Sequence, residues 1–181
     1  MVYIFKNSEQ SYDYSDILPQ NIMEYIELEK MIPYIIKKGY KSILKADFDT
    51  KQVWYEFELT LEGAKNQMKE KIMKYDSSDA VNDFSIQGLH LWLDLAKRTG
   101  LKLRFEAERA QGQEDTTLWH DGMQFPLKIE NALMMLFAIE VYASECYDNT
   151  QLHIANVEKL ETIEEVLAYD YKTGYPEKLE F

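Results

Sequence analysis

The alternation of apolar and polar residues changes its period several times along the chain, and each change predicts a new structural element. Between residues 84 and 128, a unit of short strand, glycine-ending turn, second strand and amphipathic helix begins twice. The turn glycines, Gly88 and Gly122, lie 122 − 88 = 34 positions apart, and apolar residues such as Leu93 and Leu127 recur at that offset. The repeat predicts one four-stranded antiparallel scaffold with helices packed on one face.

Each of these two units ends in a helix. The first helix is expected from about 94 to 110, with its end at Gly112. The second is much longer, because apolar and small residues continue at helical spacing for about eight turns. This seam consists of Ile129, Leu133, Leu136, Ile139, Ala143, Cys146, Thr150, Ile154 and Val157. Thr162 and Glu165 match a capping box, so a short closing helix is expected to follow and to end before Asp170.

The amino-terminal part follows other patterns. Residues 1–5 predict a short strand, and residues 7–16 a polar loop. After Pro19, apolar residues at helical spacing between 22 and 29 predict a helix that Pro33 ends or kinks. Residues 61–75 carry an apolar stripe opposite lysines and predict a further helix, followed by a polar linker.

From residue 40 to 59 the period is two, which predicts a β-hairpin with its turn at residues 49–51. The alternation places Trp54 on the strand face opposite Tyr55, so Trp54 is exposed or lies at an interface if the hairpin packs on one side. Tyr40, Trp54 and Tyr55 are therefore the candidate interaction surface. Two interpretations stay open for these aromatic residues: core or subunit packing, and contact with a peptide or sugar ligand.

Composition narrows the possible partners. The 181 residues include 46% hydrophobic residues, seven glycines and four prolines, which is typical of a globular protein rather than a disordered one. The formal net charge of −12 argues against nucleic acid and against an anionic membrane surface as partners. One cysteine excludes an internal disulfide, and the amino terminus lacks the basic start and apolar stretch of a secretion signal. We therefore expect a cytoplasmic protein.

No residue pattern predicts a catalytic, cofactor or metal site. The three histidines, His90, His120 and His153, match no zinc-ligand spacing, and His120 falls where an Asp-Gly pair predicts a turn. Cys146 lies on the apolar seam of the long helix, as a core residue would. Phosphate-binding loops and nucleophile elbows are absent from the sequence. A third hypothesis, after the two given below, is an enzyme whose site gathers distant residues around His120 and nearby carboxylates.

Residues 61–181 resemble a known domain family. The resemblance is carried by Trp92-Leu93-Asp94, by Arg98 to Leu101, by Leu118 to Leu127, by Glu140 to Tyr147 and by the ending Thr162 to Pro176. These elements are similar to domain-of-unknown-function family 4376, a phage and prophage family found in tail-fibre and tail-assembly proteins. The resemblance supplies no catalytic residues and implies only a setting, the phage tail region in a bacterial genome.

The sequence thus predicts an α+β protein with an amino-terminal hairpin and helix module, residues 1–60, and a repeated hairpin-helix domain, residues 61–181. The leading hypothesis is a non-enzymatic phage or prophage tail structural or assembly protein that contacts other tail proteins, or further copies of itself. The alternative is a carbohydrate-binding module of a tail protein that uses surface aromatics. The expected location is the bacterial cytoplasm, with incorporation into the virion left open.

Overall fold

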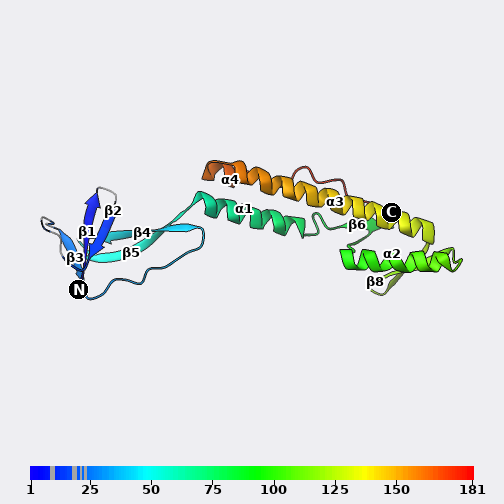
Figure 1. The fold of residues 1–181 in the computed structure, drawn as a ribbon, viewed down its shortest axis with the longest axis horizontal. Helices are drawn as coiled ribbons and strands as arrows, with labels where there is room; N and C mark the ends of the chain where they lie inside the picture. Colours follow the sequence, from blue (N-terminus) through cyan, green and yellow to red (C-terminus); the bar gives the residue numbers. More distant parts are fainter. Residues whose placement is uncertain (9–10, 18–19, 21, 23) are drawn as a thin grey trace. The chain divides into compact units, whose positions relative to one another are not determined.

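Strands dominate the first third of the chain, and helices dominate the rest (Figure 1). The computed structural model describes residues 1–8, 11–17, 20, 22 and 24–181. It confirms the α+β class and divides the chain into two compact units. Unit 1 comprises residues 1–68 and 161–168, and unit 2 comprises residues 69–160 and 169–181. The division falls inside a helix, α1 (Leu61–Asp76), rather than at its first residue.

Unit 1 contains two antiparallel sheets. β1 (Val2–Ser8) lies between β2 (Ser11–Ser15) and β3 (Tyr25–Leu28), and β4 (Tyr40–Asp47) pairs with β5 (Gln52–Leu59). The two sheets share one small core, in which Val2, Ile4 and Ile26 pack with Ala46. Unit 1 also includes the short helix α4 (Ile163–Ala168), which begins with the predicted capping box. In that box the Glu165 carboxylate accepts from the Thr162 amide, and the Thr162 hydroxyl accepts from the Glu165 amide.

The structure corrects two predictions in unit 1. The segment predicted as a helix after Pro19 contains β3, and the segment predicted as a polar loop contains β2. Ile26 of β3 is paired with Ile4 of β1, and both side chains are buried, so pairing with a distant strand overrides the weak helical pattern. Pro19 itself lies outside the described residues.

The start of α1 depends on the close approach of two glycines. The Gly39 carbonyl oxygen accepts hydrogen bonds from the Thr60 amide and the Thr60 hydroxyl, at 3.1 and 3.0 Å. The Thr60 hydroxyl also accepts from the Gly63 amide in the first turn of the helix. This arrangement brings the two backbones together so closely that a Cβ atom on Gly63 would lie 2.6 Å from Gly39 Cα. Only glycine fits there.

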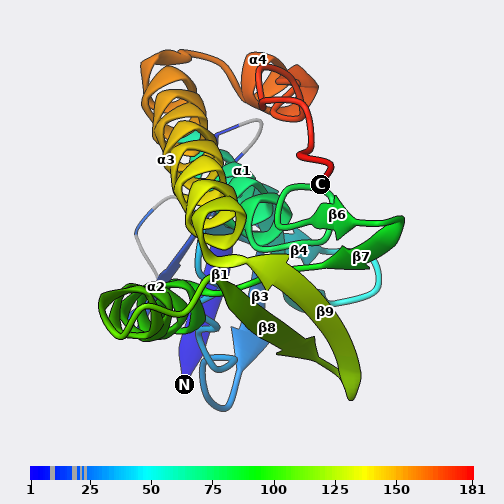
Figure 2. The ribbon, with the colours of Figure 1, turned by 90° about the vertical axis from the view of Figure 1, so that its right-hand side faces the viewer.

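Unit 2 contains both predicted hairpins. The first is β6 (Phe84–Ile86) with β7 (Leu89–Leu91), and the second is β8 (Asp115–His120) with β9 (Met123–Lys128). Both turns have positive φ at their two central residues, Gln87-Gly88 and Asp121-Gly122, as tight hairpin turns require. The hairpins form two separate two-stranded sheets (Figure 2), so the prediction of one four-stranded sheet was wrong. Residues 179–181, at the end of the sequence, lie along the edge of β6 instead, where the Phe181 amide donates a hydrogen bond to the Ser85 carbonyl oxygen.

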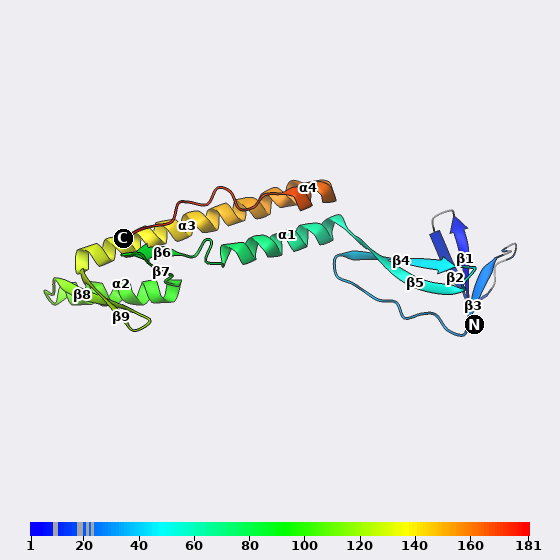
Figure 3. The ribbon, with the colours of Figure 1, turned by 180° about the vertical axis from the view of Figure 1, so that it is seen from behind.

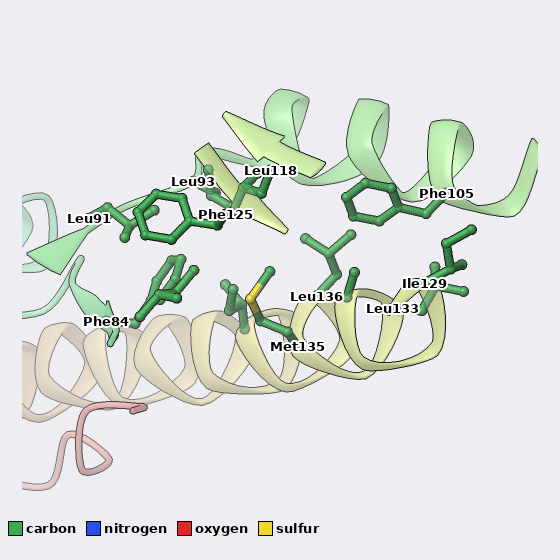
Figure 4. Packing of buried hydrophobic residues seen from close by; sticks show 13 residues of the cluster. Phe84, Leu91, Leu93, Phe105, Leu118, Phe125, Ile129, Leu133, Met135 and Leu136 are labelled. Carbon is green, nitrogen blue, oxygen red and sulfur yellow. The ribbon is translucent and has the colours of Figure 1, made fainter. Parts of the chain in front are cut away.

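Two helices complete unit 2, α2 (Leu95–Ala110) and α3 (Ile129–Lys159). Asp94 caps α2 by accepting a hydrogen bond from the Lys97 amide at 2.7 Å. Figure 4 shows Phe105 of α2 facing Leu133 and Leu136 of α3, whereas Phe125 of the second hairpin lies near Leu91 at the other end of the cluster. These residues belong to one cluster, whose buried members are Phe84, Ile86, Leu91, Leu93, Phe105, Leu118, Phe125, Ile129, Ala132, Leu133, Met135, Leu136 and Ile139.

The carboxyl-terminal segment, residues 169–181, runs back along α3 and ends beside β6 (Figure 3). His153 of α3 holds it at two points, because Nδ1 lies 2.8 Å from the Tyr169 hydroxyl and Nε2 lies 2.9 Å from the Thr173 carbonyl oxygen. A carbonyl only accepts, so Nε2 donates, and in a neutral ring Nδ1 then accepts from the hydroxyl. Among the described helices, none has the length and apolar character needed to cross a membrane.

Candidate functional site

The outer surface of the α2–α3 pair is the strongest candidate for a functional surface. Buried Arg98 fixes the two helices relative to each other: its Nε donates to Glu140 Oε2 at 2.8 Å, and its Nη1 donates to the Leu93 carbonyl oxygen at 2.7 Å. The guanidinium also lies 5.5 Å from the centre of the Trp92 ring. Arg98 thus links α2 to α3 and to the segment that precedes α2 through charge-assisted hydrogen bonds.

An apolar stripe follows the outer side of α3, away from the core. Met134, Phe137 and Val141 stand at positions i, i+3 and i+7, and their exposed fractions are 69%, 51% and 59%. This spacing places all three on one helix face. Leu95 of α2, exposed to 61%, continues the apolar surface across the groove between the helices. Single exposed apolar residues are ordinary, but a contiguous group indicates a contact surface.

A shallow groove of about 220 Å³ separates the two helices. It is lined by Leu95, Arg98, Thr99 and Lys102 of α2 and by Leu136, Phe137 and Glu140 of α3. Lys102 Nζ lies 5.3 Å above the Phe137 ring and 4.0 Å from Glu106, so the charge of the lysine is shared between a ring face and a carboxylate. We refer to Leu95, Lys102, Met134, Phe137 and Val141 together as the α2–α3 face.

The prediction from sequence missed this face, although a signal for it was present. Residues 132–139 are all apolar, so this part of α3 is hydrophobic around its whole circumference. A helix that buries a single stripe needs polar residues on its opposite side. The predicted seam accounted for the buried side of α3. The additional apolar residues, Met134 and Phe137, indicated a second apolar side that the core does not cover.

The structure does not bring the candidate residues Tyr40, Trp54 and Tyr55 together. In the β4–β5 register, Tyr55 pairs with Leu44 and Tyr40 with Leu59, on the face opposite Trp54. Trp54 is exposed, as the alternation indicated, and its Nε1 donates to Glu56 at 3.4 Å. Tyr55 is half-buried in edge contact with the Tyr34 ring, and burial raises the pKa of its phenol.

The residues considered for catalysis, His120 and Cys146, do not line the groove between α2 and α3. His120 ends β8 next to the Asp-Gly turn, and its Nε2 lies 3.5 Å from Asp121 while its buried Nδ1 has no hydrogen-bond partner among the described residues. Cys146 is buried within α3, and this burial raises the pKa of its thiol, which opposes thiolate formation. The described part of the chain contains no group of three or more His, Cys, Asp or Glu side chains that could hold a metal ion.

One histidine–carboxylate pair was not anticipated. The Asp83 carboxylate accepts hydrogen bonds from His90 Nδ1 at 2.9 Å and from Lys178 Nζ at 2.8 Å. Burial raises the pKa of the Asp83 carboxyl, but the hydrogen bonds from Lys178 and His90 outweigh it and lower the pKa overall. Ser85 pairs with His90 across the hairpin, which suggests a triad, but Ser85 is buried where the carboxyl-terminal segment joins β6. The cluster anchors that segment.

No protein-family model matches the chain, and neither a curated protein nor a solved structure matches it. The resemblance of residues 61–181 to the phage family therefore stays a prediction based on the residues that carry it.

Proposed function

We propose that this protein is a non-enzymatic structural or assembly protein of a phage or prophage tail, and that it acts through protein–protein contacts. The observation that supports this proposal is the α2–α3 face, where Leu95, Met134, Phe137 and Val141 are each more than half exposed. Exposing an apolar surface of this kind to water is unfavourable, and the free energy falls when a partner covers it. The tail setting is supported by the resemblance of residues 61–181.

Co-expression with the product of each adjacent gene tests the proposal. Affinity purification followed by light scattering gives the mass of any complex. A stoichiometric complex with a tail-like neighbour is the expected result, and Phe137→Glu is expected to abolish it, because the substitution places a charge in the apolar stripe. Leu152→Glu is the matched control, since Leu152 is 55% exposed on the same helix but lies 15 residues beyond Phe137, about 22 Å along the helix axis. Turnover of a substrate by the purified protein would contradict the proposal.

A carbohydrate-binding role is the second candidate, and the position of Trp54 supports it. The exposed indole lies beside Glu56 and across the hairpin from Lys45, so a flat apolar ring adjoins hydrogen-bonding groups. Sugars bind to such surfaces by stacking and hydrogen bonding. A glycan array would find a binding sugar, and Trp54→Ala would abolish that binding. If no glycan binds, this second candidate fails.

A further inference from the structure

The apolar stripe of α3 is electrically neutral although the molecule is strongly acidic. Residues 131–139 carry no charge, and the acidic residues at the two ends of this stretch are Glu130 and Glu140. Each is compensated within its own chain: Glu130 by Arg109 at 3.3 Å and Glu140 by Arg98 at 2.8 Å. Lys102 adds a cation at the edge of the stripe.

This neutrality favours one kind of partner. The chain has a formal net charge of −12, so a basic partner would be attracted to many other parts of its surface. A second copy of the chain is repelled by those acidic regions and meets no such repulsion at the compensated stripe. We propose that the α2–α3 face packs against the same face of a second copy, with the two α3 helices antiparallel about a two-fold axis at Phe137. This inference rests on the proposed function only in treating the face as a protein-contact surface.

The charge pattern along α3 selects this orientation. In an antiparallel pair centred on Phe137, residues equally distant from Phe137 face each other across the interface. Glu130 then faces the partner's Ser144, and Glu140 faces the partner's Met134, so no two carboxylates oppose each other. A parallel pair in the same register would place the Glu130–Arg109 pair and the Glu140–Arg98 pair each against its own copy, so like charges would face each other across the interface.

The packing geometry fits two helices of this kind. Met134, Phe137 and Val141 follow the i, i+3, i+7 spacing of a coiled-coil seam, and Phe137 lies at its centre. A central aromatic residue with aliphatic neighbours is the arrangement in which a few residues supply most of the binding energy of an interface.

The mass of the purified full-length chain tests the proposal directly. Sedimentation equilibrium of the wild type is expected to give a species of twice the 21.4 kDa chain mass. Phe137→Glu and Met134→Glu are expected to raise the dissociation constant by about tenfold or more, whereas Leu152→Glu leaves it unchanged. Because all three side chains are more than half exposed, each variant should keep the wild-type circular dichroism spectrum. A wild type that stays monomeric at high concentration, or a dimer that is unaffected by Phe137→Glu, overturns the proposal.

Cysteine cross-linking tests the two-fold axis itself. Phe137→Cys is expected to form a disulfide-linked dimer under mild oxidation, because the two copies of position 137 face each other. Leu152→Cys, far from the axis, is expected to remain unlinked, and native Cys146 is buried and does not compete. Equal cross-linking at both positions would contradict this orientation.

The outcomes separate this inference from the proposed function. A monomer that forms a Phe137-dependent complex with a tail-like neighbour supports the proposed function and overturns self-association. A Phe137-dependent dimer that binds no neighbouring gene product supports self-association and removes the support for a tail role.

Discussion

At the residue scale, two helical glycines have opposite roles, and replacing each with alanine distinguishes them. A Cβ atom on Gly63 would collide with Gly39, whereas one on Gly100 would meet nothing within 4 Å. Gly63→Ala is therefore expected to lower the free energy of unfolding by about 1–3 kcal/mol through overpacking. Gly100→Ala is expected to raise it by about 0.5–1 kcal/mol, because alanine is the better helix former. Urea unfolding measures both, and a stabilised Gly63→Ala variant would contradict the close approach.

A second prediction at the residue scale concerns the pH dependence that Asp83 contributes. Its pKa in the folded protein lies below the ordinary value of 3.8, so the folded state binds fewer protons near that pH than the unfolded chain does. The stabilisation is fully present above pH 3.8 and is lost as the pH falls through the folded pKa. Urea midpoints measured from pH 6 to pH 2.5 should therefore fall more steeply for the wild type than for Asp83→Asn. Parallel curves would show that Asp83 is not stabilised by Lys178 and His90.

At the element scale, the carboxyl-terminal segment acts as an added strand on the first hairpin. Deleting residues 179–181 removes three backbone hydrogen bonds, in which Ser85 and Gln87 of the hairpin are the partners of Leu179 and Phe181. At about 1 kcal/mol for each bond, the loss of these bonds alone should lower the unfolding free energy of unit 2 by about 3 kcal/mol. The lost packing of Leu179 and Phe181 adds to this effect. The amides of Ser85 and Gln87 should also lose their protection from hydrogen exchange.

Phe181→Ala separates the contribution of the backbone from that of the side chain in this segment. The Phe181 ring packs edge-on against Phe84 with centroids 5.9 Å apart, so its removal lowers stability through lost packing. The backbone bonds remain, and the Ser85 and Gln87 amides should stay protected. Protection that is lost equally in both variants would contradict the role of the added strand.

At the scale of the whole molecule, self-association links stability to concentration. Anything that binds only the folded chain raises its melting temperature, and a second copy of the chain does so by an amount that grows with the logarithm of its concentration. The melting temperature of the wild type is therefore expected to rise with protein concentration, whereas that of Phe137→Glu should not. Scanning calorimetry over a hundredfold range of concentration makes this comparison, with Leu152→Glu as the control that behaves like the wild type.

The sequence by itself determined the elements whose signals are local. The hairpin turns at Gly88 and Gly122, the start of α2 near residue 94 and the capping box of α4 each depend on residues within a few positions of one another. The apolar seam of α3 could also be predicted, because its helical period repeats over many turns. Such features are decided by backbone geometry and neighbouring side chains, so a pattern is enough to predict them.

Only the tertiary structure decided how distant segments meet. Ile26 is part of a strand because Ile4 lies beside it. The first hairpin pairs with residues 179–181 and does not pair with the second hairpin. Lys178 contacts Asp83 from 95 positions away, a separation over which no periodic pattern carries information. The α2–α3 face belongs to this group as well: the sequence showed excess apolar residues around Phe137, but only the packing of α2 and α3 settled which of them the core leaves exposed. Burial is a property of the assembled chain, because it depends on what each side chain meets after folding.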